Sequence, residues 1–133
     1  MTPLTLLDSR KKPSTKLAKN SRIYKTIIKA IEDKKGEDIV CLDLRKIHEA
    51  VADFFIVCTA NSAPQVKAIS DNIEKLVFEI CGENPYKQEG RQSLQWVLVD
   101  YVNIVVHVMQ PATRKFYKLE EMWSDAEADG QED

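Results

Sequence analysis

The run of residues 54–59 restricts the fold more than any other part of the sequence. It reads Phe-Phe-Ile-Val-Cys-Thr, and its apolar residues occupy odd and even positions alike. Because successive side chains of a strand point to opposite faces, such a strand needs cover on both sides, as in the middle of a sheet. The chain has 133 residues, 44% of them hydrophobic, which is about enough for one domain.

Helical patterns precede and follow this run. Residues 23–31 carry apolar side chains at a spacing of 3.6 residues, and Ser21 is placed to cap the start of that helix. After the central run, Ser62 and Pro64 are typical of the first turn of a helix. Gly82 is typical of its end. We therefore expect one helix before the central strand and a longer one after it.

Three further segments, 38–44, 94–101 and 103–109, have the composition of strands. The last two are joined closely enough for an antiparallel hairpin, and a final helical pattern begins at Pro111. The order of elements predicts an α/β or α+β protein, of which we favour α/β, with a single mixed β-sheet of about five strands and helices packed against it.

The hairpin has two largely apolar faces. Strict alternation places Trp96, Leu98 and Asp100 on one face and Val97, Val99 and Tyr101 on the other. We expect the helices alone not to cover both faces, so that a partner completes one of them. Trp and Tyr are residue types that often carry the energy of interfaces. The alternative is that they only complete the core.

Charge is concentrated at the two ends of the chain. Residues 1–20 hold five basic residues and one acidic residue, and residues 124–133 hold five acidic residues and no basic one. The predicted organisation is a flexible basic arm over 1–20, a domain over 21–123 and an acidic disordered tail over 124–133. The net charge of −2 gives no overall positive excess for nucleic-acid binding.

The sequence argues against a metal or nucleotide cofactor. Cys41, Cys58 and Cys81 have no metal-ligand spacing, and the four glycines are isolated, so no loop can wrap phosphates. The cysteines are typical of free thiols in a reducing compartment. No secretory signal and no apolar stretch of about 20 residues is present. We therefore expect a cytoplasmic protein without a cofactor, a metal or a membrane anchor.

Catalytic groups are few. Cys58 with His107 as its base is conceivable, but the apolar strand around Cys58 raises a thiol pKa and lowers its reactivity, which favours a packed core thiol. His107 is either a hydrogen-bonded histidine of a sheet face or a functional group. Asp43 and Asp100 stand at strand ends, where turn and cap residues are common.

Several motifs together resemble a known family. Residues 52–62 (Ala-Asp-Phe-Phe-Ile-Val-Cys-Thr-Ala-Asn-Ser) and 65–69 (Gln-Val-Lys-Ala-Ile) are similar to the pattern A-D-x-F-[IV]-[IV]-x-[TS]-x-[NT]-S-x-x-Q-V-x-A-I of the ribosomal silencing factors, also called RsfS, Iojap or YbeB. Residues 96–101 (Trp-Val-Leu-Val-Asp-Tyr), 105–109 (Val-Val-His-Val-Met) and 114–123 (Arg-Lys-Phe-Tyr-Lys-Leu-Glu-Glu-Met-Trp) resemble its later motifs. The resemblance spans residues 21–123.

The resemblance implies a non-enzymatic protein whose fold is nucleotidyltransferase-like. It implies binding to the large ribosomal subunit at its protein uL-fourteen, where the factor blocks joining of the small subunit and represses translation under nutrient limitation. The hairpin residues expected to contact the ribosome are Trp96, Leu98, Asp100 and Tyr101. Asn61, Ser62, Gln65 and His107 match other signature positions, whose role stays open between architecture and binding. We also expect a homodimer when the ribosome is absent, with no small-molecule substrate.

Two positions depart from the family pattern. Pro64 replaces an Arg before the signature Gln, and Val102-Asn103 replaces a Gly-Asp pair at the hairpin turn. Because Val tolerates positive φ poorly, we expect a different turn or a bulge there. Two alternative functions stay open: a nucleotidyltransferase-fold enzyme, although no strand carries the required D-x-[DE] pair, and an RNA-binding factor that acts through the basic arm. RNA contact is expected to be secondary at most.

Overall fold

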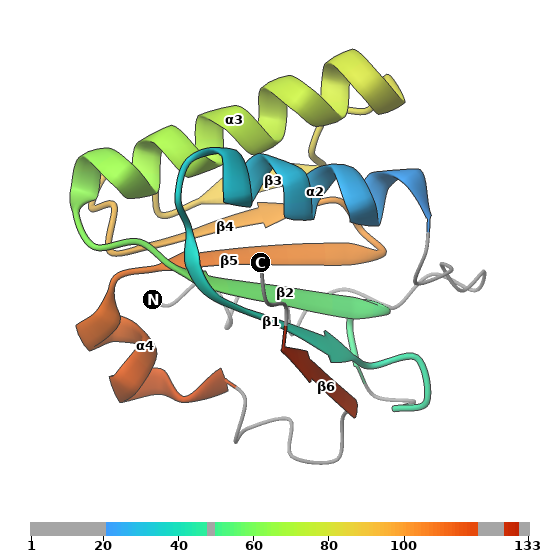
Figure 1. The fold of residues 1–133 in the computed structure, drawn as a ribbon. Helices are drawn as coiled ribbons and strands as arrows, with labels where there is room; N and C mark the ends of the chain where they lie inside the picture. The colour runs from blue at the N-terminus through green and yellow to red at the C-terminus, as the bar shows by residue number, and fades with distance from the viewer. Residues whose placement is uncertain (1–20, 48–49, 120–126, 131–133) are drawn as a thin grey trace.

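The structure is a computed structural model that describes residues 21–47, 50–119 and 127–130. The expected arm over 1–20 and the end of the family motif at Trp123 lie outside these residues. The elements follow one another in the order shown in Figure 1. They are α2 (Arg22–Asp33), β1 (Glu37–Asp43), β2 (Phe54–Thr59), α3 (Ala63–Cys81), β3 (Lys87–Glu89), β4 (Trp96–Asp100), β5 (Ile104–Met109), α4 (Pro111–Tyr117) and β6 (Glu127–Gly130).

The strands form one mixed sheet in the order β3-β4-β5-β2-β1-β6. β2 and β5 are parallel, and the other neighbours are antiparallel. The expected α/β fold with a single mixed sheet is therefore confirmed, with six strands instead of about five. All six residues of β2 are buried, as the apolar run predicted.

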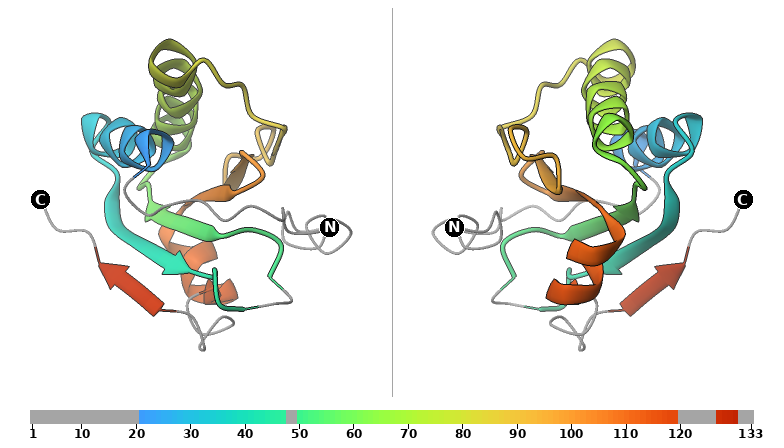
Figure 2. Two further views of the ribbon diagram at one scale, coloured as in Figure 1. Left: turned by 90° about the vertical axis from the view of Figure 1, so that its right-hand side faces the viewer. Right: turned by 90° about the vertical axis from the view of Figure 1, so that its left-hand side faces the viewer.

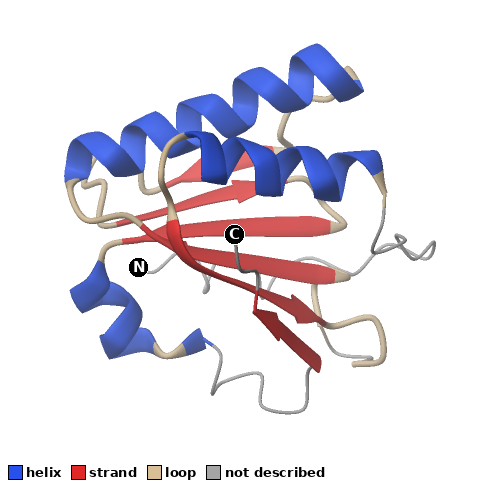
Figure 3. Ribbon diagram, viewed as in Figure 1, coloured by secondary structure: helices blue, strands red, loops and turns tan. Residues whose placement is uncertain are grey.

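Helices cover both faces of the sheet. α2 and α3 lie together over one face, and α4 lies on the opposite side, which the side views of Figure 2 and the coloured elements of Figure 3 make plain. The hydrophobic residues accordingly form two clusters. The first packs α2 and α3 against β2, β4 and β5, and the second lies on the α4 side.

The predicted helix ends are confirmed. The Oγ atom of Ser21 accepts a hydrogen bond from the backbone N–H of Tyr24 at 3.3 Å, and the Oγ atom of Ser62 accepts one from Gln65 at 3.2 Å. Both serines satisfy a backbone donor that a helix start leaves free. Gly82 ends α3 with φ of 70°, the left-handed conformation that glycine tolerates best.

One part of the expected acidic tail is ordered into the sheet. Residues 127–130 form β6, which pairs antiparallel with β1 from Val40↔Gly130 to Asp43↔Glu127. Glu, Ala, Asp and Gly are depleted in strands, so their composition indicated no structure. The outer edge of β1, however, offers backbone groups to any chain that reaches it. Residues 124–126 and 131–133 lie outside the described part of the chain.

The turn between β4 and β5 contradicts the reason that we gave for expecting a different turn or a bulge. Val102 does not avoid positive φ but adopts 73°, and the pairing of β4 with β5 is regular without a bulge. The N–H of Asn103 donates to the carbonyl of Tyr101, two residues earlier, at 2.9 Å. This is a γ-turn of the rare kind with a positive central φ. The side chain of Val102 therefore stands in a strained backbone position.

Replacing Val102 with glycine is expected to raise the free energy of unfolding by about 1 kcal/mol. A β-branched residue at positive φ costs about 1–2 kcal/mol, and the greater freedom of glycine in the unfolded chain offsets part of the gain. Urea denaturation measures the difference. Val102→Ala is the control, since it keeps the Cβ atom that causes the strain and should gain less. A less stable glycine variant contradicts the strain.

Candidate functional site

The hairpin residues expected to contact a partner are buried. The exposed fractions are 4% for Trp96, 0% for Leu98 and Asp100, and 6% for Tyr101. Trp96 and Leu98 belong to the hydrophobic cluster on the α4 side, and Tyr101 belongs to the cluster under α2 and α3. The expectation that one face of the hairpin lies open is wrong. Whether these four residues influence binding stays a prediction.

The cover on the α4 side comes from segments far away in the sequence. The residues that pack with Trp96 and Leu98 there include Leu42, Leu44, Ala50, Val51 and Leu119. Leu42 lies in β1, and the others follow β1, precede β2 or follow α4. Alternation along the hairpin could show that this face is apolar, but it could not show that these segments reach it.

Trp96 and His107 form a buried polar pair. The Nε1–H of Trp96 donates to Nδ1 of His107 at 3.0 Å. The ring of Phe55 lies 4.7 Å from the ring of His107, and the ring of Tyr117 lies 4.8 Å from that of Trp96. Burial lowers the pKa of His107 to about 3. The imidazole is therefore neutral near pH 7 and serves as a hydrogen-bond acceptor for the tryptophan.

His107 is not placed to act as a base for Cys58. Its Nε2 atom is buried and has no hydrogen-bond partner among the described residues. Cys58 belongs to the other hydrophobic cluster, under α2 and α3, and burial raises the pKa of its thiol to about 12. The proposed base and nucleophile thus lie on opposite faces of the sheet, so the Cys58–His107 pair is not formed.

Two buried carboxylates brace the β4–β5 turn. The Oδ1 atom of Asp100 accepts a hydrogen bond from the N–H of Val102 at 2.8 Å. The Oδ2 atom of Asp53 accepts one from the Nδ2 atom of Asn103 at 2.9 Å, and the carbonyl of Asn103 accepts from the N–H groups of Asp53 and Phe54. Asp100 is therefore a turn residue, as its position at a strand end indicated. The role of Asp53 was not predicted, because its partner is 50 positions away.

The signature residues at the start of α3 tie two loops together. The Oε1 atom of Gln65 accepts a hydrogen bond from the N–H of Asn61 at 2.7 Å. The Nε2 atom of Gln65 donates to the carbonyls of Lys34 and Lys35 at 3.2 and 2.9 Å. With the Ser62 cap, these bonds connect the end of β2 to the loop between α2 and β1. They give Asn61, Ser62 and Gln65 an architectural role.

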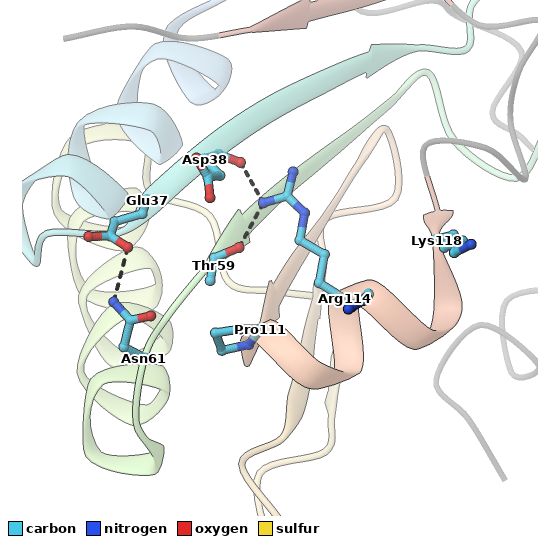
Figure 4. Close-up of a pocket in the computed structure, with 8 residues that line it drawn as sticks. Glu37, Asp38, Thr59, Asn61, Pro111, Arg114 and Lys118 are labelled. Carbon is cyan, nitrogen blue, oxygen red and sulfur yellow. Dashed lines mark hydrogen bonds between the residues drawn. The ribbon is translucent and has the colours of Figure 1, made fainter.

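A cleft opens where β2 and β5 end. It has a volume of about 550 Å³, and Figure 4 shows its lining side chains. The lining residues are Glu37, Asp38, Thr59, Asn61, Pro111, Arg114, Lys115 and Lys118. Because the chain leaves the parallel strands β2 and β5 toward opposite faces of the sheet, this is the place where α/β proteins often bind ligands.

Most polar groups of the cleft already bond to one another. The Nη1 atom of Arg114 donates to the Asp38 carbonyl at 2.5 Å and to Oγ1 of Thr59 at 2.8 Å. The Nδ2 atom of Asn61 donates to Oε1 of Glu37 at 3.0 Å. These contacts attach α4 to the ends of β1 and β2. Within the described residues, no group of three or more metal-ligating side chains is present.

A comparison with protein families identifies the family of this chain. The family model described as "Ribosomal silencing factor during starvation" matches residues 17–133. The chain belongs to the ribosomal silencing factor family. The match extends past both ends of the 21–123 domain expected from the motifs, and it includes β6. The fold relationship to nucleotidyltransferases stays a prediction.

Individual relatives agree with this assignment. The protein named "Ribosomal silencing factor RsfS" of Halalkalibacterium halodurans is 37% identical over 107 residues, which is 80% of this chain and 90% of that protein. A crystal structure of a protein from Chromobacterium violaceum has a TM-score of 0.73 and 40% identity, and the match covers 84% of this chain and 87% of that one. The mouse protein named "Mitochondrial assembly of ribosomal large subunit protein 1" is 32% identical over 74 residues, 54% of this chain and 32% of that protein.

The exposed part of the site was not anticipated. Phe116 on α4 is 77% exposed, and its ring lies 4.9 Å from the ring of the half-buried Tyr117. Both belong to the last family motif, and its aromatic pair was the signal that could have indicated them.

As for membrane insertion, the described helices include none that is both long and apolar enough to cross a bilayer.

Proposed function

We propose that this silencing factor binds the large ribosomal subunit in the cytoplasm, at its protein uL-fourteen, and blocks joining of the small subunit. Translation then falls when nutrients are limiting. The observation that carries the proposal is the family match over residues 17–133. The mouse relative, whose printed name refers to assembly of the ribosomal large subunit, supports the choice of that subunit.

The proposed contact surface is the aromatic pair of α4. Phe116 exposes 77% of its surface, and an exposed aromatic side chain is a favourable anchor for a partner. Tyr117 joins this ring to Trp96 beneath it. We propose that Trp96, Leu98, Asp100 and Tyr101 support binding indirectly. They stabilise the hairpin, which contacts the aromatic pair through Trp96 and Tyr117.

The proposed mechanism is steric and requires no chemistry. The groups that could perform catalysis are committed elsewhere: His107 is a neutral acceptor for Trp96, Asp100 holds a turn, and the Cys58 thiol is kept protonated by burial. A folded domain that occupies the joining face of the large subunit excludes the small subunit by volume alone. The overall net charge of −2 suits docking on a basic ribosomal protein.

Co-sedimentation with isolated large subunits tests the proposal. We expect the intact chain to pellet with large subunits and to reduce their joining with small subunits. Phe116→Ala should weaken pelleting about tenfold or more, as expected for an anchor residue. Tyr86→Ala is the matched control. Tyr86 is also an exposed aromatic residue, at 67%, but it precedes the edge strand β3 and does not belong to α4.

Two outcomes of this experiment count against the proposal. An intact chain that stays in the supernatant at low salt contradicts ribosome binding. Equal losses for Phe116→Ala and Tyr86→Ala contradict the aromatic pair as the contact surface.

We also propose that the free protein forms a homodimer through the same surface. The exposed aromatic pair can be covered by a second copy when no ribosome is present. Light scattering should give the mass of a dimer for the intact chain and of a monomer for Phe116→Ala. If the intact chain is a monomer at high concentration, the proposed dimer is contradicted, and the proposal of ribosome binding is unaffected.

A further inference from the structure

The outer side of α2 carries a basic groove. Its lining residues are Arg22, Lys25, Thr26 and Lys29, and its volume is about 340 Å³. Positions 22, 25 and 29 are three and four residues apart, so their side chains share one face of the helix. The opposite face of α2 is buried in the core, with residues such as Ile23, Ile27 and Ile31. The groove therefore faces solvent on a rigid, anchored helix.

The positive charge of this groove is largely uncompensated. None of its lining residues is acidic. Lys29 makes an exposed pair with Asp33 at 3.4 Å, while Arg22 and Lys25 form no ion pair within the part of the chain that the structure describes. Thr26 lies at the base of the groove and donates its hydroxyl to the carbonyl of Arg22 at 2.7 Å. Three cations thus stand together above a neutral floor.

The groove continues a strongly basic stretch of sequence. Residues 10–29 contain eight Lys or Arg and no Asp or Glu, whereas the rest of the chain contains 11 basic and 21 acidic residues. The small net charge hides this separation of charge. The family match begins at residue 17, so part of the basic stretch belongs to the silencing-factor domain.

We propose that the α2 groove binds the phosphodiester backbone of RNA. This inference rests on the proposed function, for which it names a second partner besides a ribosomal protein. The three cations extend over about 10 Å of helix axis, which suits a row of phosphates better than a single small anion. Tyr24, the aromatic residue of α2, is 5% exposed and cannot stack on a base. The contact is therefore made to phosphates and carries little sequence preference.

RNA and the ribosomal protein can be bound at the same time. α2 lies on one side of the sheet and α4, with its aromatic pair, lies on the other, as the two views of Figure 2 show. A chain docked through Phe116 thus keeps its basic groove accessible. The groove and the aromatic pair can also be tested separately for the same reason.

Fluorescence anisotropy with a labelled single-stranded RNA oligonucleotide tests the inference on the full chain. The groove variant combines Arg22→Gln, Lys25→Gln and Lys29→Gln. The control combines Lys46→Gln, Lys67→Gln and Lys75→Gln, which remove the same charge from exposed positions outside both the groove and the cleft. We expect the groove variant to bind about tenfold or more weaker at low salt, and its slope of log Kd against log salt to fall by about two, as the loss of three phosphate contacts predicts. The control should stay close to the intact chain.

Three results overturn the inference: no RNA binding by the intact chain, equal weakening in the control, or binding to anionic phospholipid vesicles without binding to RNA. Circular dichroism checks the folding of both variants. We expect both to fold, because all six replaced side chains are exposed. If the intact chain binds RNA but does not pellet with large subunits, only the proposed function is contradicted. If the intact chain pellets with large subunits but does not bind RNA, only this inference is contradicted.

Discussion

Replacing Trp96 with alanine is expected to lower the free energy of unfolding by about 3–5 kcal/mol. Trp96 is 4% exposed and packs against the rings of His107 and Tyr117. Its removal leaves a large cavity in the cluster on the α4 side, and the loss is a large fraction of the about 5–15 kcal/mol that stabilises a typical domain. Urea denaturation followed by circular dichroism measures the change.

Trp96→Phe separates the volume of the side chain from its hydrogen bond. Phenylalanine keeps most of the ring but removes the N–H that donates to Nδ1 of His107. A buried acceptor without its donor costs about 1–3 kcal/mol, so this variant should lie between the alanine variant and the intact chain. An alanine variant as stable as the intact chain contradicts the burial of Trp96. Because Trp96→Ala is expected to destabilise the fold, Phe116→Ala is the better variant for measuring ribosome binding.

Acidification is expected to destabilise the protein through His107. Burial lowers the pKa of His107 to about 3 in the folded state, whereas a histidine in an unfolded chain has a pKa of about 6.5. Between these two values the unfolded chain binds a proton that the folded chain excludes. The free energy of unfolding therefore falls by about 1.4 kcal/mol for each pH unit below about 6.5, or about 3 kcal/mol by about pH 4.

His107→Asn isolates this contribution. The side-chain oxygen of asparagine can take the place of Nδ1 as acceptor for Trp96, and it does not titrate. Carboxylates elsewhere act alike in both proteins, so the difference between their stability curves against pH belongs to His107. We expect that difference to change by about 3 kcal/mol between about pH 7 and pH 4. Parallel curves contradict a neutral, buried His107.

Several elements follow from local sequence alone. The caps at Ser21, Ser62 and Gly82 are in place, because a cap depends on residues within one turn of the helix end. The apolar run of β2 lies between β5 and β1 with all six residues buried. The motifs also placed the chain in the silencing-factor family. These features are short in range or depend on the order of motifs, and both can be recognised along a single chain.

The environment of the hairpin required the tertiary structure. Periodicity showed that both faces are apolar, but the cluster that contains Trp96 and Leu98 is completed by residues outside the strands such as Leu44 and Leu119. Burial depends on which distant segments meet, and alternation along one strand does not contain that information. The exposed aromatic surface is therefore at Phe116 and not on the hairpin, where the sequence predicted it.

The sequence by itself determined the helices and their caps, the central strand, the α/β class and the family. Only the tertiary structure decided that β6 pairs with β1, that Asp53 braces a turn 50 residues away and that Val102 accepts a positive φ of 73°. The physical reason is one of range. Local propensity and periodicity act over a few residues, whereas these three features depend on backbone and side-chain groups brought together by the folded sheet.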